Sequence, residues 1–239
     1  MKYVYGPVKS RRLGLSLGLS LTPHKVCNLD CLYCQLGKTN ETVSQRKEYV
    51  SIEGILAEFK EWLKNNPEAA KELNYITLSG SGEPTLNSQL GRLIDKIKKI
   101  SRTSVAVITN ATLLNDEKMR SDLKFADLLV PSLDAVEQGV FEKINRPQAG
   151  IKIKDIISGL ISLRKGFKGK IWLEVMLVRG VNDNLVDIRK LKEAIEKIRP
   201  DKIQINSPVR TTAEAGIMAV DSEKLEVIRK ILGPTAEIV

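Results

Sequence analysis

Residues 26–35 read Val26-Cys27-Asn28-Leu29-Asp30-Cys31-Leu32-Tyr33-Cys34-Gln35 and hold all three cysteines of the 239-residue chain. Three residues separate the first cysteine from the second, and two separate the second from the third, so one short loop presents three thiols. A 4Fe–4S cluster usually takes four cysteine ligands. A cluster held by three would keep one iron open, and an open metal position serves chemistry rather than architecture. This loop therefore predicts an enzyme.

Two other uses of the three cysteines have to be weighed. A disulfide framework is disfavoured because the count is odd, the chain is long and no apolar signal segment precedes the loop. A structural zinc site stays open, because His24, the chain's one histidine, lies three residues before Cys27 and could complete a Cys3His tetrahedron. The loop alone leaves iron–sulfur and zinc as alternatives.

The cysteine spacing, with Tyr33 just before the last cysteine, resembles the signature of the radical S-adenosylmethionine (SAM) superfamily. Two later segments extend the resemblance. One is Leu78-Ser79-Gly80-Ser81-Gly82-Glu83-Pro84-Thr85-Leu86, similar to the superfamily's Gly-Gly-Glu segment, with Ser81 in place of its first glycine. The other is Ile108-Thr109-Asn110-Ala111-Thr112-Leu113-Leu114, similar to a ribose-contacting turn after the third strand. Each is weak alone, but in this order and spacing they favour a radical enzyme.

The resemblance implies two cofactors. Cys27, Cys31 and Cys34 would hold a 4Fe–4S cluster whose fourth iron is chelated by the amino and carboxylate groups of SAM. An electron from an external one-electron reductant would cleave the sulfonium, and the 5′-deoxyadenosyl radical so formed would abstract hydrogen from the substrate. The protein supplies positioning, electrostatics and exclusion of water. The implied SAM contacts are Tyr33 at the adenine, Gly80, Ser81 and Gly82 by close backbone approach, Glu83 at the ammonium, and Thr109 and Asn110 at the ribose.

Several of these residues also have a purely structural interpretation. Glu83 could cap a helix, Thr109 and Asn110 could be ordinary turn residues, and Tyr33 could be a core aromatic. Arginine binds carboxylate or phosphate through a planar fork, so Arg179 is the candidate for the cofactor carboxylate or a substrate anion. Three further candidates could face the substrate, with structural ion pairs as the alternative: Arg146, Arg210 and the strand residue Glu174.

Short apolar runs are typical of buried parallel strands. They lie at residues 74–79, 104–109, 127–131, 170–178 and 202–206, and a sixth candidate at 15–21 alternates leucine with serine and glycine. Helical periodicity separates them, most clearly over residues 52–63 and 185–198. Asp134 and Glu137 fit a capping box that would open a helix near residues 136–144.

About six strand–helix units predict an α/β fold with a parallel sheet and helices outside. A complete eight-stranded barrel needs ~250 residues, so six units predict an incomplete (βα)6 parallel barrel. The resemblance implies the same open barrel of radical SAM type, with the cluster loop after the first strand. The three motifs follow predicted strands and should meet at their carboxyl ends. Residues 1–239 are expected to form this single domain, without an auxiliary cluster or a separate substrate domain.

The net charge of +9 permits RNA or another large anion as a partner, although surface lysines that favour solubility explain it equally well. Aromatic residues make up 5% of the chain and form no stacking stripe of the kind that binds single-stranded RNA. No apolar run approaches the ~20 residues that span a bilayer, and no signal peptide is visible. With free thiols, this predicts a cytoplasmic protein that does not enter a membrane.

The opening segment resembles a subgroup placed near the wyosine-base synthases, which modify a guanine of transfer RNA; it reads Tyr5-Gly6-Pro7-Val8-Lys9-Ser10-Arg11-Arg12-Leu13-Gly14. The resemblance implies an oxidoreductase or transferase that acts on a macromolecule such as tRNA. One alternative is an activase that installs a glycyl radical in a partner protein. The other is a non-catalytic zinc or iron–sulfur binding module.

Overall fold

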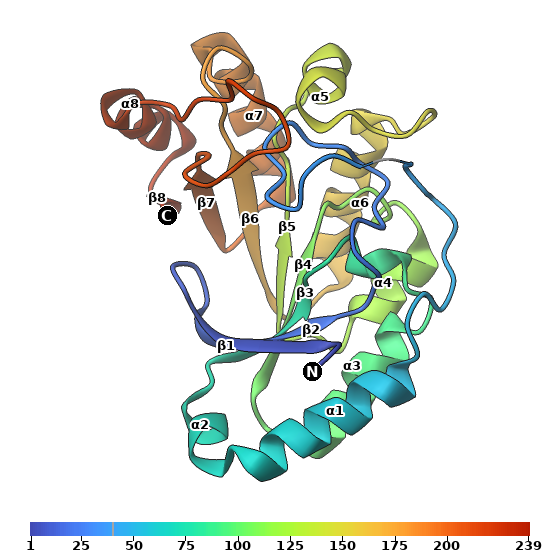
Figure 1. Ribbon diagram of the computed structural model, residues 1–239. Coiled ribbons are helices and arrows are strands. Elements are labelled where there is room, and N and C mark those ends of the chain that lie inside the picture. Colours follow the sequence, from blue (N-terminus) through green and yellow to red (C-terminus); the bar gives the residue numbers. More distant parts are fainter. Residues whose placement is uncertain (40) are drawn as a thin grey trace.

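A computed structural model describes residues 1–39 and 41–239, and one eight-stranded sheet organises it (Figure 1). The strands follow one another in sequence order, and β2 to β8 are parallel, whereas β1 pairs antiparallel with β2. Their bounds are β1 Val4–Ser10, β2 Gly14–Ser20, β3 Tyr75–Ser79, β4 Ser104–Thr109, β5 Leu128–Pro131, β6 Lys170–Met176, β7 Lys202–Asn206 and β8 Ala236–Ile238. In the described part of the chain β1 and β8 do not pair with each other, so the barrel is open.

The α/β fold with a partial parallel barrel confirms the prediction, and the six predicted strands correspond to β2 to β7. Two strands were not predicted. The outer strand β1 is mostly exposed and contains Pro7, and β8 is three residues long, so neither reads as an apolar run. The cysteine loop consequently follows the second strand of the chain, not the first as predicted, although β2 is the first parallel strand.

Helices cover the outer face of the sheet, where Figure 1 shows α1, α3, α4 and α6 on one side. The helices are α1 Ile52–Asn65, α2 Pro67–Glu72, α3 Leu90–Ile100, α4 Glu117–Leu123, α5 Gln138–Asn145, α6 Ile153–Gly166, α7 Leu185–Ile198 and α8 Ser222–Leu232, with the 3-10 helix η1 Pro84–Leu86. The predicted helices at 52–63 and 185–198 are α1 and α7. Helix α1 starts where the Ser51 hydroxyl accepts from the Gly54 amide and buries Phe59 and Trp62 in the core. No helix among the described residues has the length and apolar composition that crossing a bilayer requires.

The inner faces of β2 and β3 differ from an ordinary barrel core. On β2, Leu17 and Leu19 are fully buried against the helices, while Ser16, Gly18 and Ser20 alternate with them on the other face. Strand β3 repeats the pattern, with Ile76 and Leu78 outward and Thr77 and Ser79 inward. The inward residues line a cavity, which explains why leucine alternates with serine in the sequence. The small, polar side chains on this face leave room for the cavity that contains the candidate site.

The turn between β1 and β2 closes one end of the barrel interior. Its residue Leu13 is 4% exposed and packs in a separate small cluster with Ala106, Leu128 and Val130, which lie on β4 and β5. Burying a leucine side chain stabilises the fold by about 1.5–3 kcal/mol. Leu13 therefore holds the β1–β2 hairpin turn against the barrel interior.

The predicted capping box at Asp134 is wrong. Helix α5 begins at Gln138 after Glu137, and neither side chain of the predicted pair caps it. The Asp134 carboxylate instead accepts from the side chains of Asn145 and Tyr33 and from the Met176 amide on the neighbouring strand. Asp134 is buried, so its oxygens need internal donors, and the adjacent elements supply them.

Candidate active site

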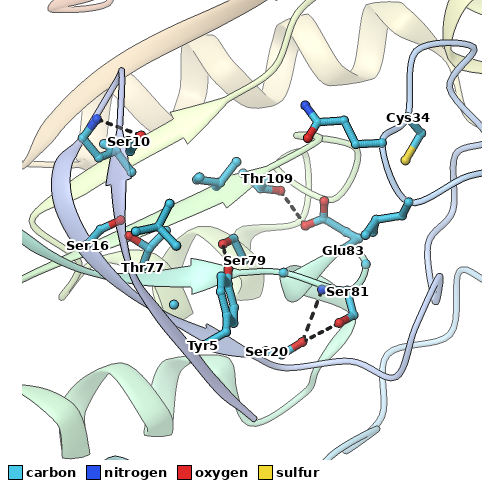
Figure 2. A pocket seen from close by; sticks show the side chains of 18 of the residues that line it. Tyr5, Ser10, Ser16, Ser20, Cys34, Thr77, Ser79, Ser81, Glu83 and Thr109 are labelled. Atoms are coloured by element: carbon cyan, nitrogen blue, oxygen red, sulfur yellow. Dashed lines mark hydrogen bonds between the residues drawn. The ribbon is translucent and has the colours of Figure 1, made fainter. Parts of the chain in front are cut away.

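The three predicted motifs meet at one cavity of about 780 Å³. They follow β2, β3 and β4, whose carboxyl ends lie at the same rim of the sheet. The predicted cluster ligands and SAM contacts that line the cavity are Cys27, Cys31, Cys34, Gly80, Ser81, Gly82, Glu83, Thr109 and Asn110. Figure 2 shows Cys34, Glu83, Thr109 and Ser81 around one end of this pocket.

Backbone hydrogen bonds fix the cysteine loop against the end of helix α5. The Leu32 amide donates to the Ile144 carbonyl at 2.9 Å, and the Asp30 amide donates to the Asn145 carbonyl at 3.0 Å. Carbonyl groups at a helix C-terminus have no partner within the helix, so the loop satisfies them. On its other side the loop accepts a 2.9 Å hydrogen bond from the Val43 amide to the Cys27 carbonyl.

Each cysteine sulfur lies beside a nitrogen donor from a different part of the chain. Lys25 Nζ is 2.9 Å from Cys34 Sγ, Asn145 Nδ2 is 3.4 Å from Cys31 Sγ, and Asn110 Nδ2 is 3.6 Å from Cys27 Sγ. Donors of this kind stabilise negative charge on sulfur. The three donors therefore favour thiolates at these positions, against the effect of burial.

Burial opposes ionisation of the Cys27 and Cys31 thiols in the free protein. It raises the pKa of Cys27 to about 11, and the nearby Glu83 carboxylate adds to that shift. Burial also raises the pKa of Cys31, while the hydrogen bond from Asn145 lowers it. Metal ligation requires the thiolate form, so iron binding at this loop should release protons.

The donor set fits a cluster better than a single metal ion. The described residues include no group of three or more His, Cys, Asp or Glu side chains that could hold one ion. A tetrahedral zinc needs its ligands to converge on one point, as the Cys3His alternative requires, and His24 lies exposed. In a cluster each cysteine binds its own iron, so the thiols need only to face a common space, as these three do.

Gly82 allows the second motif to lie directly against the cysteine loop. A Cβ atom at Gly82 would be 2.1 Å from the Val26 carbonyl oxygen, immediately before Cys27. The same carbonyl accepts from the Glu83 amide at 2.9 Å. Ser81, which replaces the glycine of the family pattern, is tied to strand β2 because its hydroxyl lies 3.0 Å from the Ser20 hydroxyl (Figure 2).

Glu83 is 3% exposed and its carboxylate organises two turns. Oε1 accepts from the Thr85 amide at 3.0 Å and from the hydroxyls of Thr85 and Thr109 at 2.6 and 2.7 Å. Oε2 accepts from the Asn110 amide at 2.8 Å. Burial raises the pKa of Glu83 and these hydrogen bonds lower it. The helix-capping interpretation thus holds for η1, while Oε2 keeps an acceptor position free of contacts from the described residues.

Asn110 links the third motif to the first. Its side chain donates to the Asn28 side chain at 2.7 Å, and Asn28 donates to the Thr112 hydroxyl at 2.7 Å. Both Thr109 and Asn110 line the cavity, but each also makes the internal hydrogen bonds expected of a turn residue. The structure brings both residues to the rim of the cavity.

The structure places Tyr33 and Arg179 outside the cavity lining. The Tyr33 hydroxyl donates to Asp134, and burial raises the pKa of Tyr33. Arg179 lies beyond the end of β6, where its guanidinium is 3.3 Å from the Asp221 carboxylate. The predicted contacts of Tyr33 with adenine and of Arg179 with a carboxylate thus have no counterpart among the cavity residues.

The remaining charged candidates divide between the cavity and the surface. Arg210 lines the cavity and donates to the Gln35 side chain at 3.0 Å, whereas Arg146 pairs with Glu214 at 2.5 Å outside it. Glu174 on β6 is buried and forms an ion pair with Arg12 from the β1–β2 turn. Lys25, Asn145 and Asp134 were missed: Lys25 is adjacent to the cysteine segment and could have been proposed, but no sequence signal connects the other two to it.

Buried Asp134 predicts a stability that falls as the pH rises. Burial raises its pKa to about 6, although its hydrogen bonds lower it, whereas an unfolded aspartate has a pKa of about 3.9. Between these values the unfolded state holds fewer protons than the folded state, so the free energy of unfolding decreases with pH. The shift corresponds to about 3 kcal/mol between about pH 4 and about pH 7.

Asp134→Asn should therefore lack this slope. Denaturant unfolding of the reduced, iron-free proteins at several pH values measures the effect. From about pH 4 to about pH 7, we expect the free energy of unfolding of the variant to rise by about 3 kcal/mol relative to that of the wild type. A constant difference between the two proteins at all pH values would contradict a raised pKa at Asp134.

Comparison with known proteins identifies related chains. The model of the radical SAM superfamily matches residues 21–198. A UPF0026 protein of Methanocaldococcus jannaschii is 34% identical over 240 residues, which cover 100% of this chain and 73% of that protein. A protein of Brachyspira hyodysenteriae named GTPase Obg is 42% identical over 229 residues, covering 96% of this chain. The chain spans only 33% of that second relative, so a name given to the whole relative describes more than the shared part.

Solved structures share the fold. A radical SAM methyltransferase from Sphaerobacter thermophilus superposes with a TM-score of 0.73 at 16% identity, covering 94% of this chain and 66% of that one. TYW1 with a lysine-pyruvate adduct bound superposes with a TM-score of 0.64 at 22% identity, covering 91% of this chain and 72% of that one.

Proposed function

Because the chain belongs to the radical SAM superfamily and to the UPF0026 proteins, we propose that it cleaves SAM reductively at a 4Fe–4S cluster held by Cys27, Cys31 and Cys34. Membership makes the protein a radical SAM enzyme and implies both cofactors. The observation that supports the residue assignment is the presence of three thiols and the Glu83 carboxylate on the wall of one cavity. When bound, the cluster and SAM supply a hydrogen-abstracting radical.

The chain's own residues prepare the site for these cofactors. The Lys25, Asn110 and Asn145 side chains donate toward the sulfurs and stabilise their ionised form. Glu83 Oε2, buried next to the Asn110 amide, is the acceptor for the SAM ammonium group. The close approach at Gly82 keeps this carboxylate beside the cysteine loop. Thr109 and Asn110 lie within the same wall for the ribose.

Iron analysis tests the assignment of the cluster ligands. Anaerobic reconstitution with iron and sulfide should give about four irons per chain in the wild type. Cys27→Ser, Cys31→Ser and Cys34→Ser should each retain far less iron, because a hydroxyl is a poor ligand for a soft iron–sulfur centre. Tyr33→Phe, which keeps the ring but cannot donate to Asp134, should hold as much iron as the wild type. Equal iron content in all five proteins would show that the cysteines are not the cluster ligands.

We further propose that the substrate is a macromolecule, with tRNA as the first candidate. The charge of +9 and the resemblance to the wyosine-base synthases support this choice. Binding should weaken steeply as salt rises, because released counterions drive the association of basic proteins with RNA. Adding tRNA to the reconstituted enzyme should increase the rate of SAM cleavage. Stimulation by a protein fraction and not by RNA would favour a glycyl-radical activase instead.

A further inference from the structure

The cavity extends well beyond the cysteine loop. Figure 2 shows Ser10, Ser16 and Thr77 at the end near the β1–β2 hairpin, opposite Cys34. The turn of this hairpin, anchored by Leu13, closes the barrel interior below that end. The proposed cofactors lie at the cysteine end, so the hairpin end is available to the substrate.

Hydroxyl groups line both ends, but they differ in their partners. Toward the cysteine loop, Ser20 pairs with Ser81 at 3.0 Å, and Tyr5 pairs with Ser79 at 2.7 Å. At the hairpin end, the Ser10 hydroxyl accepts from the Arg12 and Leu13 amides, but the Thr77 hydroxyl is buried and has no partner in the described part of the chain. Ser16 on the adjacent strand β2 pairs with Tyr75, two residues before Thr77; it lines the same cavity, and its side chain makes no hydrogen bond to the described residues. A buried polar group without a partner, such as the Thr77 hydroxyl, is rare and calls for an explanation such as a ligand.

The charge of the lining indicates what such a ligand would be. Cationic side chains along the cavity are Lys2, Lys9, Arg11, Arg12, Lys25 and Arg210. The one carboxylate among the described lining residues is Glu83, whose oxygens already accept four hydrogen bonds. A cleft lined by one sign of charge attracts ligands of the opposite sign.

Arg12 is held in place for this role. Its Nη1 forms an ion pair with Glu174 on β6, and its neighbour Leu13 is buried in the barrel. A guanidinium has five N–H donors, and among the described residues Glu174 is the one ion-pair partner of this side chain. Glu174 therefore orients Arg12 and leaves its other donors to a ligand in the cavity.

We propose that the hairpin end of the cavity binds a phosphoryl group of the substrate through Arg12, Ser16 and Thr77. A phosphoryl group presents several oxygens in a tetrahedral arrangement, which can accept from a guanidinium fork and from hydroxyls on two adjacent strands. A planar carboxylate offers two oxygens and would use fewer of these donors. The phosphoryl group belongs either to an RNA backbone or to a free nucleotide. This inference rests on the proposed function only in taking the cavity as the active site.

Calorimetric titration of the reconstituted protein with SAM bound tests the inference. The probes are uridine 5′-monophosphate, inorganic phosphate, uridine and a short single-stranded RNA. We expect uridine to bind at least about tenfold more weakly than its monophosphate, because it lacks the charge-assisted contacts. RNA that binds more tightly than the monophosphate identifies the backbone as the source of the phosphoryl group, and monophosphate binding alone identifies a free ester.

Three variants separate binding from structure. Arg12→Gln should weaken monophosphate binding by about tenfold, and Lys99→Gln, a matched loss of charge on the exposed face of α3, should not. Thr77→Val should weaken binding and at the same time raise the unfolding temperature, because it removes a buried hydroxyl without a partner. If Thr77 only supported the fold, its replacement would not weaken binding while raising the unfolding temperature.

Equal binding of uridine and its monophosphate would overturn the inference, as would wild-type affinity in both Arg12→Gln and Thr77→Val. Loss of stability together with affinity in Thr77→Val would also overturn it, because the hydroxyl would then have an internal partner. If the wild type fails to hold iron or to cleave SAM, that result would instead contradict the proposed function. The same titrations are repeated with the iron-free protein, so that phosphate binding can be measured whatever that result.

Discussion

Gly82→Ala is expected to destabilise the protein and to reduce the iron it retains. The added Cβ would lie 2.1 Å from the Val26 carbonyl oxygen and 2.9 Å from its carbonyl carbon, and backbone cannot turn aside as a flexible side chain does. The cysteine loop must move, or the hydrogen bond from the Glu83 amide must break. Overpacking of this kind costs about 1–3 kcal/mol, occasionally more. Denaturant unfolding and iron content after reconstitution measure the two effects.

Gly139→Ala is the matched control. Gly139 lies in helix α5, and a Cβ there meets nothing within 4 Å. Alanine in a helix is about 0.5–1 kcal/mol more favourable than glycine, so this variant should be as stable as the wild type or more so. If Gly82→Ala has the same stability and iron content as Gly139→Ala, the second motif does not lie against the cysteine loop as described.

Glu83→Gln should lose both stability and affinity for SAM. All four hydrogen bonds to the carboxylate come from donors, so the amide nitrogen of glutamine must face at least one of them. Leaving a buried donor without a partner costs about 1–3 kcal/mol. The loss of charge also removes the proposed acceptor for the SAM ammonium group. Hydrogen bonds to charged groups contribute about 1.5–3 kcal/mol, so SAM should bind about ten- to a hundredfold more weakly.

Thr85→Val distinguishes these two roles of Glu83. Thr85 is fully buried, donates its hydroxyl to Glu83 Oε1 and is not part of the cavity lining. Its replacement should lower the free energy of unfolding but preserve the carboxylate and most of the SAM affinity. Wild-type SAM affinity in Glu83→Gln would show that Glu83 only caps η1 and joins the two turns.

The strands that carry the three motifs were predictable because short apolar runs, or for β2 an alternation of leucine with small residues, mark them and helical segments separate them. Strands β2 to β7 all coincide with predicted segments, and the carboxyl ends of β2, β3 and β4 bring the motifs together as expected. The exposed strand β1 could not be recognised in this way. Its hairpin nevertheless shapes the cavity, because Leu13 and Arg12 enter the barrel from the turn that follows it.

Individual contacts across the fold were less predictable. The spacing of Asp134 and Glu137 matches a capping box as well as it matches a buried carboxylate, and only tertiary packing decides between them. Asn145 is 114 residues from Cys31 in the sequence, so nothing local connects the two side chains. Arg179 follows a strand, as the motif residues do, but its side chain contacts Asp221 and does not line the cavity.

Anaerobic cleavage of SAM by the reconstituted, chemically reduced protein tests the central claim most directly. The account predicts that wild-type protein forms 5′-deoxyadenosine and methionine in equal amounts, and that Cys31→Ser forms neither above background. A protein that holds zinc in place of iron, or one that binds a full cluster yet leaves SAM intact under these conditions, would contradict it.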